Sequence, residues 1–82
     1  MNIQLIKGSF EAKDASELLN QLFKNKIQFH ENKISDTLNE EDIKMRERRI
    51  IELQNERNNA LQQIKQLKHA VTLDAVLQIS GN

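Results

Sequence analysis

The two histidines are the first side chains in this sequence whose type could support chemistry. His30 is followed directly by Glu31, and a histidine close to carboxylates could bind a metal ion or act as a general base. The alternative, which we favour, is a solvated or seam-edge histidine on a charged helix. His30 and His69 lie too far apart along the chain to form one site. We expect His69 to lie near the end of a helix, where a cation meets the negative end of the helix dipole.

Acidic side chains cluster in the middle of the chain. Asp36 is followed by the run Glu40-Glu41-Asp42. The cluster lacks the alternating aspartates and the glycine of a calcium-binding loop. We therefore expect these acids to stabilise the positive end of a helix that begins here.

A basic segment follows the acids within one helical turn. It contains Lys44, Arg46, Arg48 and Arg49. Such a segment could contact the phosphates of a nucleic acid, although no aromatic side chain is interleaved for base stacking. We keep nucleic-acid contact through Lys44, Arg48 and Arg49 as the alternative to a solvated, ion-paired helix face.

Composition excludes several classes of function. The 82 residues include no Cys, Trp, Tyr or Pro, only two Gly, and twelve basic against twelve acidic side chains. This excludes disulfides, cysteine-based metal sites, cysteine nucleophiles and glycine-rich phosphate loops. Neutrality argues against general binding of polyanions. We predict a non-enzymatic protein with no catalytic, metal-binding or cofactor-binding residues. No apolar run is long enough to span a membrane and no signal peptide is visible, so we expect a cytoplasmic location without membrane contact.

The first half of the chain predicts a strand and a long helix. Apolar Ile3 and Leu5 alternate with polar residues in the range 2–7, which is typical of a half-buried strand. Gly8 should break the strand, and Ser9 should cap a helix over residues 10–35. The apolar stripe of this helix comprises Ala15, Leu18, Leu19, Leu22, Phe23, Ile27, Phe29 and Ile34, and extends to Leu38.

A turn over residues 36–39 should lead into a second helix over residues 40–70. Thr37 with Glu40 matches a capping box, and Asn39 is the alternative cap. The second helix has apolar residues at heptad spacing, which predicts a coiled-coil seam interrupted by Arg46 and Arg57. The apolar members of the seam are Ile43, Ile50, Leu53, Ala60, Ile64, Leu67 and Val71.

Folding back at the turn brings the two helices together in an antiparallel hairpin. This places Ile27 against Ile50, and Arg46 beside Glu31. It also places His30 near Glu47, and Phe10 against Leu67. Arg57 should lie near Glu17 and Asn20, so that both seam arginines meet acids or amides.

Strict alternation over residues 71–79 predicts a final strand. Because the hairpin brings the chain ends together, the two strands can pair antiparallel. The predicted fold is α+β, mostly helical, in the order β-α-α-β, as a single domain over residues 1–82. In architecture the hairpin with short strands resembles prefoldin-type chaperone subunits. Their strands lie between the helices rather than at the chain ends, so no residue or activity carries over.

A two-stranded ribbon is marginally stable alone, which predicts a homodimer or higher oligomer. Two contacts remain open: a four-helix bundle or a four-stranded sheet. The interface residues that we expect are Leu18, Leu22, Phe29, Ile51 and Leu61 for the bundle, and Leu73, Leu77 and Ile79 for the sheet. The sequence thus favours an interaction protein that presents a coiled-coil surface or a sheet edge to an unidentified protein partner.

Overall fold

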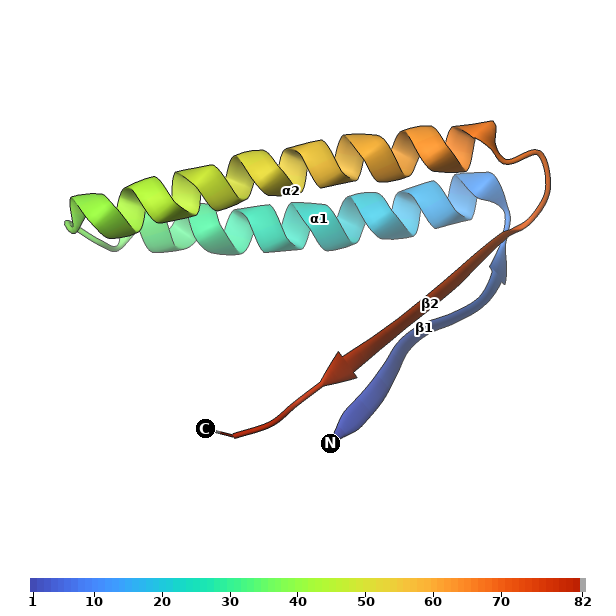
Figure 1. Cartoon of the computed structure of the whole chain (residues 1–82), viewed down its shortest axis with the longest axis horizontal. Helices are drawn as coiled ribbons and strands as arrows, with labels where there is room; N and C mark the ends of the chain where they lie inside the picture. Colours follow the sequence, from blue (N-terminus) through green and yellow to red (C-terminus); the bar gives the residue numbers. More distant parts are fainter. Residues whose placement is uncertain (82) are drawn as a thin grey trace.

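The computed structural model of the protein describes residues 1–81 (Figure 1). Strand β1 (Asn2–Phe10) leads into helix α1 (Ala12–Ser35), which is followed by helix α2 (Glu40–Gln66) and strand β2 (Val71–Gln78). The two strands pair antiparallel in one two-stranded sheet. The predicted β-α-α-β order and the helical hairpin are therefore confirmed.

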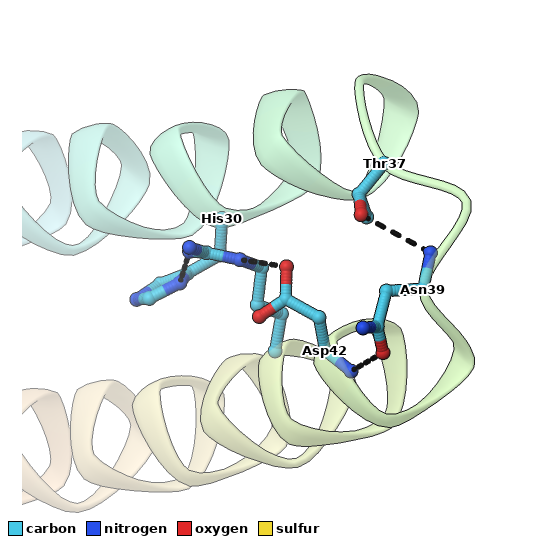
Figure 2. A network of polar contacts seen from close by, with 5 residues as sticks. His30, Thr37, Asn39 and Asp42 are labelled. Carbon is cyan, nitrogen blue, oxygen red and sulfur yellow. Dashed lines mark hydrogen bonds and ion pairs between the residues drawn. The ribbon is translucent and has the colours of Figure 1, made fainter.

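The turn between the helices depends on Asn39. Its side-chain oxygen accepts a hydrogen bond from the backbone N–H of Asp42 at 3.1 Å, and three acids follow in the first turn of α2. Of the two caps considered, Asn39 is therefore right and the capping box at Thr37 is wrong. The Thr37 hydroxyl instead accepts a hydrogen bond from the backbone N–H of Asn39 at 3.2 Å, which helps to hold the turn (Figure 2).

The first strand is longer than predicted. β1 continues through Gly8 and Ser9 to Phe10, because residues of β2 are available opposite each of these positions. Ser9 lies opposite Thr72 in the ladder, so its predicted role as a helix cap is wrong. The position before α1 is occupied by Glu11, whose side chain makes no capping hydrogen bond.

The second helix is shorter than predicted and ends at Gln66. The chain must leave the helix there, because residues 67–70 form the connection that returns β2 alongside β1. His69 lies in this connection rather than in the helix, and Lys65 is the basic residue of the last helical turn. Strand β2 ends at Gln78, although Ile79 still exchanges backbone hydrogen bonds with Met1 at 2.8 and 3.0 Å.

The main cluster of buried side chains lies at the corner where the hairpin meets the ribbon. Ala15, Ile64 and Val71 are buried together there, with partly buried neighbours from β1, α1 and β2. Leu53 and Ile27 are buried further along the hairpin. The other seam positions within α2 are at least half-buried. Two apolar residues of the predicted stripes are exposed because they lie outside the helices: Leu38 in the turn, and Leu67 beyond α2.

The ribbon leaves the hairpin at this corner and diverges from the helices (Figure 1). The molecule is therefore a thin, open shape measuring 47 × 30 × 14 Å. Both free ends of the ribbon lie together, far from the corner (Figure 1). This arrangement leaves much of the ribbon without a covering layer.

Candidate interaction surfaces

The ribbon has one apolar and one polar face. Side chains on a strand alternate between the two faces, and directly paired residues share a face. The register places Phe10 opposite Val71, Ile6 opposite Ala75, and Ile3 opposite Leu77. The apolar face carries no charge and comprises Ile3, Ile6, Gly8, Phe10, Val71, Leu73, Ala75 and Leu77. The polar face carries Asn2, Gln4, Lys7, Ser9, Thr72, Asp74, Val76 and Gln78.

The apolar face is covered at one end only. Val71, at the corner, is 4% exposed, and Leu73 and Ala75 are half-buried. Toward the free end of the ribbon, Leu77 is 45% exposed, and Ile79, directly after β2, is 48% exposed. The end of the ribbon away from the corner is therefore an exposed apolar surface, which is a common sign of an interaction site.

The outer edge of β2 has unpaired backbone groups. Because Ile79 exchanges both backbone hydrogen bonds with Met1, it points its N–H and C=O toward β1. Alternation along an antiparallel strand then directs the N–H and C=O of Thr72, Asp74, Val76 and Gln78 to the outer edge. Only Asp74 is charged among the residues of this strand. Such an edge is a template for another strand.

The outer edge of β1 is less regular. The pairing shifts between Gln4 and Ile6, so Leu5 has no direct partner in β2. The Gln4 side-chain amide bridges the irregularity, because it donates to Ile6 O at 2.9 Å and to Ala75 O at 3.1 Å. Lys7 adds a charge to this strand. A bulge and a lysine are devices that discourage pairing at an edge.

The apolar residues expected at a helical interface are dispersed over the hairpin. Leu18 and Leu61 line separate open grooves, whose other lining residues are mainly polar or charged. Ile51 and Phe29 are exposed, and Leu22 is half-buried. These helices therefore offer less continuous apolar surface than the ribbon does.

Phe29 is surrounded by cations. Lys33 Nζ lies 5.6 Å and Arg46 Cζ lies 6.0 Å from the centre of its ring. The ring of His30 meets it edge-on, with the ring centres 5.5 Å apart. Cations at this range interact favourably with an aromatic face. Phe29 is thus part of a charged cluster rather than of an apolar patch.

His30 belongs to a polar network with Arg46 and Asp42 (Figure 2). Arg46 Nη1 lies 3.0 Å from His30 Nδ1, and Arg46 Nε lies 3.6 Å from an Asp42 carboxylate oxygen. The partners of Arg46 are therefore His30 and Asp42, in place of the predicted Glu31. Partial burial lowers the pKa of His30 below its ordinary value of 6.5, and the positive charge of Arg46 lowers it further.

The network leaves His30 poorly suited to metal binding or proton transfer. Arg46 can only donate a hydrogen bond, so His30 Nδ1 must accept it and cannot carry the proton. Within residues 1–81, no group of three or more His, Asp or Glu side chains is placed to hold a metal ion. The arrangement is that of a structural contact between the two helices.

The basic segment of α2 is partly neutralised within the chain. Arg49 Nη1 lies 3.0 Å from Glu52 and 3.5 Å from Glu56, so its charge is paired. Lys44 and Arg48 are exposed, and among the described residues neither has a carboxylate within 4.0 Å. The structure therefore leaves two of the three predicted nucleic-acid contacts free of ion pairs.

The second seam arginine, Arg57, lines an open groove whose other lining residues include Asn20, Glu31 and Gln54. Its Nε atom is buried and has no hydrogen-bond partner. Glu17 lines a different groove. Arg57 therefore brings a polar group into the seam without the carboxylate partner expected at Glu17.

Comparison with known proteins gives no relative for this arrangement. No protein-family model, no curated protein and no solved structure matches the chain. Neither helix described in residues 1–81 combines the length and apolar character needed to cross a membrane. The function must therefore be argued from the surfaces of the molecule itself.

The alternation in the sequence predicted that Leu73, Leu77 and Ile79 share a face, but not which backbone groups of this strand point away from β1. Ala75 and Val76 occupy the middle of the exposed edge. Their alternation was visible in the sequence. The direction of their backbone groups depends on which residues pair with β1, and only the register shows this.

Proposed function

We propose that the protein is a small, non-enzymatic interaction protein that self-associates and presents its helical hairpin to a protein partner. The observation that carries the proposal is the uncharged apolar face of the ribbon, which is covered at the corner and exposed toward Leu77 and Ile79. Self-association would cover this surface and leave the outer sides of the coiled-coil hairpin free for another protein.

The chemistry of the hairpin supports a non-enzymatic role. His30 is held by Arg46, and His69 lies in the connection beyond α2. The grooves along the helices are open and lined mainly by polar side chains, whereas small-molecule sites are usually concave and apolar. The open grooves along the described helices therefore support contact with another macromolecule better than they support catalysis.

Sedimentation velocity over a range of concentrations tests the proposal. We expect concentration-dependent self-association that is lost in Leu77→Lys, because a lysine cannot be buried there without losing its hydration. Asn2→Lys is the matched control, since it adds the same charge to the polar face of the ribbon. A protein that remains monomeric at every concentration, or an equal effect of both variants, would contradict self-association through the apolar face.

Nucleic-acid binding is the second candidate, favoured by the two exposed cations Lys44 and Arg48, which lack ion pairs in the described structure. Electrostatic binding is strongest at low salt, so retention on DNA or RNA should be measured at about 50 mM salt. Binding that is lost in Lys44→Ala/Arg48→Ala, but kept in Lys13→Ala/Lys65→Ala, would support this candidate. No retention of the wild-type protein at low salt would contradict it.

A further inference from the structure

The ribbon lacks the partners that an isolated sheet needs. Two-stranded sheets are marginally stable in water and usually need a third strand or a covering layer. Here the hairpin covers only the corner end of the apolar face. A second copy of the chain could supply the missing strands by pairing along an edge.

The edge of β2 is the better of the two edges for this purpose. Its outward backbone groups alternate without interruption from Thr72 to Gln78, whereas β1 carries the irregularity between Gln4 and Ile6. Two β2 strands related by a twofold axis perpendicular to the sheet would run antiparallel. Their apolar faces would also remain on the same side of the combined sheet.

The register of such a pair is restricted by the two faces and by one charge. Side chains that lie directly opposite each other in the two β2 strands must point to the same face of the sheet. The twofold axis must therefore pass between one residue and the same residue of the other copy, and the register is named by that residue. An axis at Asp74 would place two like charges directly opposite each other, which is unfavourable. An axis at Val76 would place Val71 opposite Gly81, beyond Ile79, which is the last residue hydrogen-bonded to β1 in the described ribbon.

An axis at Ala75 satisfies both restrictions and places the exposed apolar residues beside apolar residues of the other copy. Leu77 then lies opposite the partner's Leu73, and Ile79 lies opposite the partner's Val71. Val71 is the residue buried against Ala15 and Ile64 at the corner. The exposed end of each ribbon would therefore lie beside the corner of the other copy, where apolar side chains are already gathered.

From this self-complementarity we propose that two copies pair through their β2 edges, with Ala75 opposite the partner's Ala75. The product is a four-stranded sheet in the order β1-β2-β2-β1, with both hairpins on its apolar side. The Asp74 and Val76 backbone groups of each copy bond to those of the other. The proposal rests on the self-association in the proposed function and specifies its contact.

The helical faces are weaker candidates for the same contact. Phe29 is surrounded by His30, Lys33 and Arg46, and Leu18 and Leu61 lie in separate, largely polar grooves. A four-helix bundle built on these residues would bury charges and amides. Pairing of the two β2 edges instead gives hydrogen-bond partners to backbone N–H and C=O groups that already point away from β1.

Disulfide cross-linking tests the register directly, because the natural sequence contains no cysteine. In the proposed dimer, position 75 and its copy form a pair without backbone hydrogen bonds, with the Cα atoms about 4.5 Å apart, which a disulfide can bridge. Ala75→Cys should therefore cross-link efficiently under mild oxidation. Leu77→Cys is the matched control, since it would lie about four residues, or roughly 13 Å, from its copy and should not cross-link.

A proline at the edge tests the backbone contact. Val76→Pro removes an N–H that points away from β1, so it should leave the circular dichroism spectrum unchanged. It should weaken dimerisation about tenfold or more, because two intermolecular hydrogen bonds are lost. Asn2→Pro, on the outer edge of β1, should leave dimerisation unchanged.

The outcomes separate this inference from the proposed function. Efficient cross-linking at position 75 but not 77, together with weaker association of Val76→Pro, supports the edge contact. A dimer that is insensitive to Val76→Pro and does not cross-link at position 75 overturns the inference but leaves self-association intact. Cross-linking of Val76→Cys in place of Ala75→Cys overturns the register. A monomer at all concentrations overturns both proposals.

Discussion

Arg46 Nη1 and His30 Nδ1 lie 3.0 Å apart, so two basic side chains share one hydrogen bond between the helices. The contact requires a neutral histidine, because the guanidinium group can only donate. Asp42, one turn before Arg46, compensates part of the arginine charge at 3.6 Å. The predicted contact of Arg46 with Glu31 across the helices is therefore wrong: the acid beside Arg46 is Asp42 of α2 itself, and the contact across the helices is made to a histidine.

This pair should make the stability of the protein sensitive to mild acid. The pKa of His30 is lowered by partial burial and by the charges of Arg46, Arg49 and Lys26, so the unfolded chain binds the proton more readily. Stability that is present above pH 6.5 should fall as the pH decreases toward the folded pKa. We expect His30→Gln to lose less stability than the wild type between about pH 7.5 and about pH 5.5 in urea unfolding. An equal loss in both proteins would show that His30 is not responsible.

The hairpin should depend strongly on Leu53, which is 0% exposed and is the largest fully buried side chain. Leu53→Ala should lower the free energy of unfolding by roughly 2–5 kcal/mol, because it removes apolar contacts and leaves a cavity. Ile51→Ala is the matched control, since Ile51 is 57% exposed and should cost less than about 0.5 kcal/mol. Urea unfolding followed by circular dichroism measures both. Similar losses of stability in both variants would contradict the packing of α2 through the side that carries Leu53.

The start of α2 should depend on the side chain of Asn39. Asn39→Ala should destabilise the protein by about 1 kcal/mol, because the N–H of Asp42 loses its acceptor. Asn39→Asp keeps an acceptor at the same place and should retain most of the stability. Thermal unfolding of the three proteins compares them. If the alanine variant matched the wild type, Thr37 would have to be reconsidered as the cap.

Gly8 should resist substitution although it has room for a side chain. Its φ of 144° lies in a region that other residues rarely adopt, while an added Cβ would approach Phe10 no closer than 4.0 Å. Gly8→Ala should therefore cost about 1–3 kcal/mol through backbone strain alone. Gly81→Ala, which meets no atom within 4 Å, should be neutral. Thermal unfolding distinguishes the two variants, and equal stability of both would exclude strain at Gly8.

Periodicity was enough to predict the elements and their order. The alternation around Leu73 and Leu77 and the heptad spacing around Leu53 and Ile64 each match one simple repeat. Burial of Val71, Ile64 and Leu53 follows from these repeats. Element type and approximate position are thus encoded locally in this chain.

Element ends and polar partners were harder to predict, because they depend on tertiary contacts. Ser9 has the side chain of a good helix cap, but the ladder with Thr72 extends β1 over it. His69 follows a regular helical pattern, yet the chain must leave the helix so that β2 can return. Which side chain of α1 contacts Arg46 depends on how the two helices are rotated about their own axes, and sequence spacing does not define this rotation. In the structure that side chain is His30.

The ribbon pairs the strand that precedes the hairpin in the sequence with the strand that follows it. This sets an order for the formation of the ribbon. During synthesis β1 leaves the ribosome long before β2, and the two strands come together efficiently only after the intervening helices have folded back. The proposed β2 edge is therefore complete only on a chain whose hairpin already exists.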